Sequence, residues 1–175
     1  APTFATLLTG WQLDPFLIIG LGATSWVYFE GAKRVNRAHP RSPWPKYRST
    51  FFYLGIGAMV LGLLSPIARY DTSLFSAHMV QHMLIVMIGV PLMLCGGPVT
   101  LLLRAANPEI RRKTIIPILH SRILKTLTFP VIGWVFFAAT MWATHFTGVF
   151  NHALEHEWAH RLEHLWYVTA AAFFW

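Results

Sequence analysis

The chain has 175 residues, of which 55% are hydrophobic and 12% are charged, and its mean hydropathy is +0.48. A soluble domain usually carries about 25% charged residues, so this chain has roughly half the usual number available to cover a water-facing surface. The composition excludes a disordered chain and a collagen-like repeat, and the single cysteine, Cys95, excludes a disulfide scaffold. A polytopic membrane protein made of α-helices is the class that remains.

The positive charge is concentrated in two stretches of the chain. There are 14 Lys and Arg against 7 Asp and Glu, a net charge of +7. The first stretch contains Lys33, Arg34, Arg37, Arg41, Lys46 and Arg48, and the second contains Arg104, Arg111, Arg112, Lys113, Arg122 and Lys125. Long apolar runs separate the two stretches, which is typical of cytoplasmic loops in a membrane protein. This pattern favours a lipid bilayer, and no nucleic acid, as the partner of the basic residues.

Five segments are long and apolar enough to be predicted as membrane spans, which require about 20 mostly apolar residues each. In chain order they are residues 15–32, 51–66, 74–94, 127–146 and 157–175. We expect them to form one transmembrane helix bundle, a single domain over residues 1–175. The chain begins with Ala1 and stops inside an apolar run at Trp175, so we expect a trimmed or processed chain with more spans in the full-length protein.

The stretch between the third and fourth predicted spans is mixed in character. Residues 99–104 are apolar but short, and Asn107-Pro108 is expected to break any helix that follows them. Residues 115–124 are weakly amphipathic, which is compatible with a helix on the membrane surface or with a basic linker. If both basic stretches are cytoplasmic, the N-terminus lies on the extracytoplasmic side of the plasma membrane.

Nine histidines stand in the chain, and six of them follow a four-residue spacing. His78 and His82 form one pair, and His152, His156, His160 and His164 form a run. Residues four apart share one face of a helix. With the orientation above, His78 lies about 6 Å inside the outer end of its span, and His160 and His164 lie about 5 and 10 Å inside theirs. Two HxxxH pairs are therefore expected at similar depth near the extracytoplasmic face.

An ionisable side chain inside a membrane is a candidate functional residue, and imidazole is the commonest metal ligand in proteins. The predicted ligands are His78, His82, His156, His160 and His164. Glu163 is expected to orient an imidazole, and Met79 and Met83 are the nearest thioethers. Thioether sulfur favours copper slightly, but zinc and haem stay open. The alternative without a ligand is that the histidines only form hydrogen bonds between helices.

Two enzyme or cofactor functions compete with a metal-capture site. The segment His156-Glu157-Trp158-Ala159-His160 matches the HExxH pattern of zinc proteases, and residues 160–164 match the inverted HxxEH pattern. His82 and His164 would also suit the two axial positions of a b-type haem in an electron-transfer subunit. No convincing catalytic nucleophile is present, so we expect a binding role rather than an enzyme.

Several of these residues resemble a known family, the CtaG-like cytochrome c oxidase assembly factors of caa3-type oxidases. The similar segments are Ser65-Pro66, Asp71, residues 74–84 (LFSAHMVQHML), Pro91-Leu92, Gly97-Pro98 and residues 160–165 (HRLEHL). The resemblance covers most of the chain from the second span onward. Glu157 falls where the family pattern has no fixed acid, which argues against the protease.

The resemblance implies a bacterial, multi-pass plasma-membrane protein of about seven spans. It also implies a role in making an active copper-containing oxidase, with cytochrome c oxidase subunits, or another respiratory complex, as partners. The positions that match its histidine motifs are His78, His82, His156, His160, Glu163 and His164. We therefore expect a copper-binding assembly factor that captures the ion at the extracytoplasmic face. A structural accessory subunit of a respiratory complex is a further alternative.

Overall fold

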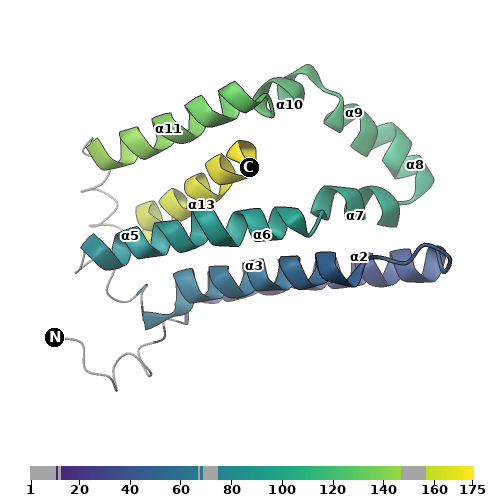
Figure 1. Cartoon of the computed structure of the whole chain (residues 1–175), viewed down its shortest axis with the longest axis horizontal. Helices are drawn as coiled ribbons and strands as arrows, with labels where there is room; N and C mark the ends of the chain where they lie inside the picture. The colour runs from purple at the N-terminus through teal and green to yellow at the C-terminus, as the bar shows by residue number, and fades with distance from the viewer. Residues whose placement is uncertain (1–10, 12, 67, 69–74, 147–156) are drawn as a thin grey trace. The chain divides into compact units, whose positions relative to one another are not determined.

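The computed structural model describes residues 11, 13–66, 68, 75–146 and 157–175, and all regular elements in these ranges are helices (Figure 1). This confirms the predicted all-α class for the described residues. The helices form two compact units, Ala1–Asn107 and Pro108–Trp175. The prediction of a single domain over the whole chain stays a prediction.

The first unit is built on three long helical segments. Its elements are α2 (Pro15–Ala38), α3 (Lys46–Leu64), α5 (Phe75–Met83), η1 (Leu84–Gly89), α6 (Val90–Cys95) and α7 (Pro98–Ala105). The elements α5, η1 and α6 follow one another directly and pack antiparallel beside α3, as Figure 1 shows. The predicted spans 15–32, 51–66 and 74–94 therefore all fall on helices.

Helices α2 and α3 extend beyond the apolar segments that predicted them. Helix α2 begins where Asp14 Oδ1 accepts a hydrogen bond from the Phe16 N–H at 2.9 Å, and it continues to Ala38 rather than ending at residue 32. Helix α3 begins at Lys46 rather than at residue 51. Hydropathy marks only the apolar part of a helix, whereas Lys and Arg are good helix formers and continue it into the polar region.

The third segment contains a π-helical stretch that the sequence analysis missed. The N–H of Val90 donates to the carbonyl oxygen of Ile85, five residues back, at the end of η1. Pro91 follows directly, and a proline inside an α-helix lacks an N–H and collides with the carbonyl four residues earlier. The wider π turn places that carbonyl elsewhere, so the helix continues through Pro91.

An aromatic cluster holds the basic end of the first unit together. The Tyr28 and Phe52 rings stack with centroids 3.7 Å apart and an angle of 8° between their planes. Trp44 Nε1 donates to Tyr28 Oη at 3.0 Å, and Tyr28 Oη donates to the carbonyl oxygen of Gly96 at 2.9 Å. The next residue, Gly97, has a φ of 63°, a left-handed conformation that favours glycine and turns the chain from α6 into α7. The aromatic cluster thereby links α2, α3 and the α6–α7 turn.

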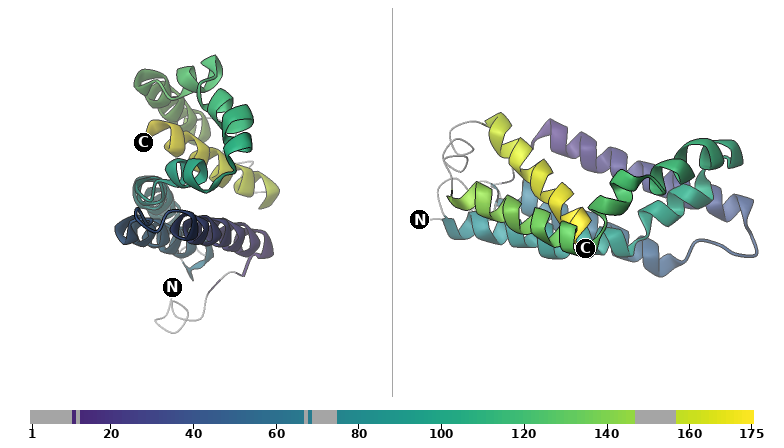
Figure 2. Two further views of the ribbon diagram at one scale, coloured as in Figure 1. Left: turned by 90° about the vertical axis from the view of Figure 1, so that its right-hand side faces the viewer. Right: turned by 90° about the horizontal axis from the view of Figure 1, so that it is seen from above.

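The second unit begins with short helices and ends with a long antiparallel pair. Its elements are α8 (Pro108–Ile110), η2 (Arg111–Ile115), α9 (Ile116–Leu119), α10 (Arg122–Leu127), α11 (Pro130–Phe146) and α13 (Glu157–Phe174). Ala106 ends α7 and Pro108 opens α8, so the predicted helix break at Asn107-Pro108 is confirmed. Helices α11 and α13 lie side by side (Figure 2).

Two helices within the described ranges are long and apolar enough to cross a membrane. They are Lys46–Leu64, with 19 residues, and Ser76–Ala105, with 30 residues. The other predicted spans are mostly helical over their described residues, with a short break at Thr128 and Phe129, and their crossing of a membrane stays a prediction. Helix α11 has 17 residues. Helix α13 carries Glu157, Arg161 and Glu163 in its first two turns, which lowers the apolar character of that end.

Candidate metal centre

The histidine pair of the first unit is formed by a single helix. His78 and His82 lie four residues apart on α5, so their side chains share one face. Their exposed fractions are 1% and 3%, and their rings meet edge to face with centroids 4.2 Å apart. The two Nε2 atoms are 2.7 Å apart, which is hydrogen-bond distance. Both imidazoles are therefore buried, with the same ring nitrogen of each directed at the other.

The short contact between the two Nε2 atoms requires that they share one proton. One Nε2 must carry a proton and the other must offer a lone pair for the 2.7 Å contact to be a hydrogen bond. A tetrahedral ion that held both nitrogens at about 2.0–2.1 Å would keep them about 3.3 Å apart. Small rotations of the two rings would open that space, and the shared proton would move to Nδ1 of its own ring. The pair can consequently act as a chelating site for one ion.

Gln81 lies beside the pair and was not identified as a candidate from the sequence. Its exposed fraction is 1%, and within the described residues its Oε1 atom has no hydrogen-bond partner. Leaving a buried polar atom without a hydrogen bond costs about 1–3 kcal/mol, so such an atom in a folded protein requires an explanation. Gln81 lies three residues after His78, on the same side of α5. An amide oxygen here can ligate a metal or accept a hydrogen bond from a ligand.

A close approach of α3 fixes the helix that carries the pair. A Cβ added to Gly62 would lie 3.1 Å from Ile85 Cγ1 and 3.7 Å from the Gln81 carbonyl oxygen. The absence of a side chain at this position lets α3 pack directly against the junction of α5 and η1. Ile85 itself is completely buried. The backbone behind the histidines is thus held by tight helix packing.

The second histidine motif lies in the second unit, on α13. His164 and Glu163 are both buried there, and Tyr167 follows one turn later with no exposed surface. Tyr167 Oη forms a hydrogen bond with Thr144 Oγ1 of α11 and lies 3.2 Å from His145 Nδ1. Buried polar groups therefore line the contact between α11 and α13. A carboxylate that accepts a hydrogen bond from an imidazole can orient a metal-binding ring, and this role stays a prediction for Glu163.

His145 is a further candidate ligand that is not among the ligands predicted from the sequence. Its Nδ1 lies 2.9 Å from the carbonyl oxygen of Met141, which can only accept, so Nδ1 carries the proton in the neutral ring and Nε2 carries the lone pair. Metal-ligating histidines are commonly held in this way. The exposed His120 makes the same contact with Ile116, so this bond alone is not diagnostic. His145 differs because it also contacts Tyr167.

The remaining predicted site residues are His156, Glu157, His160, Met79 and Met83. His156 lies outside the described residues, and so do the side chains of Glu157 and His160 at the start of α13. Met79 is half-buried and Met83 is exposed. The HExxH interpretation and the role of the thioethers stay predictions.

The protein is similar to several mycobacterial proteins. It is 30% identical to "Uncharacterized protein Mb0105" of Mycobacterium bovis and to "Uncharacterized protein MT0111" of Mycobacterium tuberculosis, over 99% of this chain and 27% of each relative. It is 29% identical to "Uncharacterized protein ML1998" of Mycobacterium leprae, over 91% of this chain and 25% of the relative. The chain thus spans about a quarter of the length of these curated relatives. No solved structure matches it.

The family comparison covers the helices that carry both histidine motifs. A family model described as "Cytochrome c oxidase caa3 assembly factor (Caa3_CtaG)" matches residues 26–175. This agrees with the resemblance found in residues 74–84 and 160–165. Because the match covers most of the chain, the protein belongs to the family of cytochrome c oxidase caa3 assembly factors.

Proposed function

We propose that this protein is a membrane-embedded copper-binding assembly factor that supplies the ion to cytochrome c oxidase. Membership of the assembly-factor family supports the role in making the oxidase. The observation that carries the copper proposal is the pair His78 and His82, two buried imidazoles whose Nε2 atoms lie 2.7 Å apart. Copper is the cargo of the protein, and no turnover is required.

The chemistry of the pair suits transient capture of a cation. Two neutral imidazoles provide lone pairs without a fixed negative charge, so an ion bound by them remains cationic and can be passed on. When an ion replaces the hydrogen bond between the Nε2 atoms, the Nε2 proton moves to Nδ1 of the same ring, so both rings bind as neutral imidazoles. Gln81 adds a buried oxygen acceptor next to the pair. Imidazole serves copper, zinc and iron alike, and the family role in oxidase assembly favours copper among them.

The proposal extends to the second motif and to the membrane topology. His160 and His164, with His156, would provide further copper ligands, and Glu163 would orient one of their rings. The spacing of both motifs supports this, because each HxxxH pair is predicted at similar depth near the extracytoplasmic face. We assign five spans to the chain, with the N-terminus extracytoplasmic, in a bacterial plasma membrane. An oxidase subunit that receives copper is the expected partner.

The test is the metal content and absorption spectrum of protein purified in detergent after growth with excess copper. A His78→Ala/His82→Ala double variant is compared with the unchanged protein. The control is a His39→Ala/His120→Ala double variant, which removes two exposed histidines. We expect near-stoichiometric copper in the unchanged protein and in the control, and a loss of most of it in the His78/His82 variant. Circular dichroism verifies that all three proteins are helical.

Other outcomes of the same measurement distinguish the competing functions. A Soret band would replace copper with haem and assign an electron-transfer role. Bound zinc would favour the protease, and Glu157→Gln would then be expected to abolish proteolysis. Absence of metal after growth in copper would contradict the proposal and leave a structural subunit, whose histidines serve only to connect helices.

A further inference from the structure

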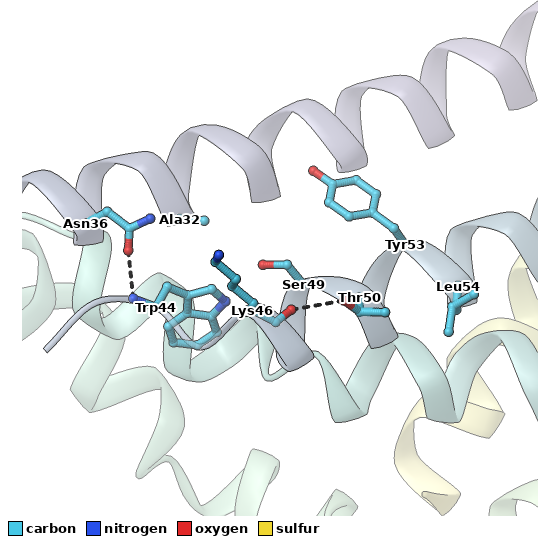
Figure 3. Close-up of a pocket in the computed structure, with 8 residues that line it drawn as sticks. All are labelled: Ala32, Asn36, Trp44, Lys46, Ser49, Thr50, Tyr53 and Leu54. Atoms are coloured by element: carbon cyan, nitrogen blue, oxygen red, sulfur yellow. Dashed lines mark hydrogen bonds between the residues drawn. The ribbon is translucent and has the colours of Figure 1, made fainter.

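A cavity of about 570 Å³, open to the surface, lies between α2 and α3 at the basic end of the first unit (Figure 3). Its lining changes character along α3. Asn36, Lys46, Ser49 and Thr50 line one end, and Tyr53 and Leu54 line the other. It is a separate feature from the histidine pair, which stands on α5. The cavity therefore combines a polar, cationic end with an apolar end.

The polar end carries hydrogen-bond donors directed into the space. Figure 3 shows the Lys46 ammonium group and the Ser49 hydroxyl pointing into the gap between the two helices. Asn36 Oδ1 accepts a hydrogen bond from the Trp44 N–H at 2.7 Å, which fixes the orientation of the amide and leaves its NH2 group as a donor. An ammonium, a hydroxyl and an amide NH2 form a donor set for an anion, because ammonium and NH2 groups cannot accept.

The charges around the cavity leave this end strongly positive. Six Lys and Arg stand between residues 33 and 48, and Glu30 is the acid nearest to them in the sequence. Glu30 is paired with Lys33, at 3.4 Å. Arg48 and Arg104 lie over the Trp44 ring, at 5.1 and 5.8 Å from its centroid. Lys46 has no acidic partner among the described residues, so its ammonium group is available to a ligand.

The start of α3 adds to the positive potential at the same place. Lys46 is the first residue of this 19-residue helix, whose N-terminus receives no hydrogen bond from a capping side chain because Pro45 precedes it. The N-terminal end of a helix carries a partial positive charge and attracts anions. This contribution reinforces the side chains of the cavity.

The other end of the cavity opens along apolar, outward-facing surface. Tyr53 and Leu54 line it and are both exposed, and Leu61 continues the exposed apolar surface two turns further along α3. Helix α3 is one of the two helices long and apolar enough to cross a membrane. A ligand with a charged head and a hydrocarbon chain would place the head at Lys46 and the chain along Leu54. A free inorganic anion would leave the apolar end unused.

We propose that this cavity binds an anionic phospholipid, with its phosphate held by Lys46, Ser49 and Asn36 and an acyl chain lying over Tyr53 and Leu54. A basic pocket between membrane helices is a known mode of recognition for anionic headgroups. The lipid would fix the ends of α2 and α3 at the membrane surface. This function is independent of copper binding.

Native mass spectrometry of the detergent-purified protein tests the proposal. The protein is titrated with dioleoylphosphatidylglycerol, with dioleoylphosphatidylcholine, and with inorganic phosphate as a competitor. Lys46→Ala is expected to weaken phosphatidylglycerol binding about fivefold, the effect of one cation near an anionic lipid. Lys46→Arg is expected to retain most of the binding. The matched control is Lys33→Ala, which removes the same charge from the same stretch but from outside the cavity, and it should bind as the unchanged protein does.

Each of the other outcomes contradicts the lipid site. An equal loss in Lys46→Ala and Lys33→Ala would indicate general attraction to a basic surface. Displacement of the lipid by millimolar inorganic phosphate would identify a free-anion site. Equal binding of phosphatidylcholine, or unchanged binding in Lys46→Ala, would show that the cavity does not recognise a negative headgroup.

Discussion

The aromatic cluster and the histidine pair are both buried in the first unit, but their polar atoms are used differently. Tyr28 Oη accepts a hydrogen bond from Trp44 Nε1 and donates one to Gly96, so both its donor and its acceptor capacity are used. Beside the histidines, Gln81 Oε1 has no hydrogen bond within the described residues. Buried polar groups that only hold helices together are normally satisfied within the fold. The contrast indicates that the aromatic cluster is structural and that the histidine region is adapted to a ligand.

The largest expected effect is a loss of stability when the aromatic cluster is disrupted. Phe52→Ala removes a ring that is 2% exposed and stacked on Tyr28, so we expect the free energy of unfolding to fall by about 3–5 kcal/mol. Phe51→Ala is the matched control, because Phe51 directly precedes Phe52 on α3 and is 40% exposed. Thermal unfolding in detergent measures both. Equal destabilisation by the two variants would contradict the assignment of the aromatic cluster as the structural core.

A smaller effect, of opposite sign, is expected beside the histidines. Gln81→Leu replaces an unsatisfied buried amide by an apolar side chain, so the metal-free protein should gain about 1 kcal/mol in its free energy of unfolding. Copper binding should weaken about tenfold if the amide supports the ion. Val80→Leu, at an exposed position of the same helix, should change neither quantity appreciably. Destabilisation of the metal-free protein by Gln81→Leu would show that the amide is structural.

The smallest effect comes from removing one hydrogen bond of the aromatic cluster. Trp44→Phe keeps an aromatic ring beneath Arg48 and Arg104 but removes the Nε1–H donor to Tyr28. We expect a loss of about 0.5–1.5 kcal/mol in the free energy of unfolding, with copper content unchanged. The same thermal and metal assays measure both. A loss of copper in this variant would contradict the separation of the two regions.

Much of the helical architecture could be predicted because hydropathy and charge act locally. The described residues of the five apolar segments are mostly helical, and Asn107-Pro108 breaks the helix between the third and fourth segments as expected. Helices α2 and α3 extend several residues beyond the predicted spans because Lys and Arg continue a helix past its apolar part. The π-helical stretch before Pro91 was missed because several local backbone solutions accommodate a proline, and the sequence does not choose among them.

The candidate site was predictable where it depends on helical spacing alone. The shared face of His78 and His82 follows from their separation of four residues, and the structure adds the orientation of the rings. Gln81 was missed because its burial depends on how α5 packs. His145 was left out because its contact with Tyr167 joins residues 22 positions apart in the chain. Neither contact has a signature in the local sequence.

The π-helical stretch η1 sets the direction in which the histidine pair faces relative to α6. A π turn holds about one residue more than an α turn, so it shifts the phase of everything N-terminal to it by about 100°. With a continuous α-helix from Phe75 to Cys95, the imidazoles of His78 and His82 would face a different direction relative to α6. The direction in which His78 and His82 face thus depends on the extra residue in η1, between the histidines and Pro91, and not on the histidines themselves.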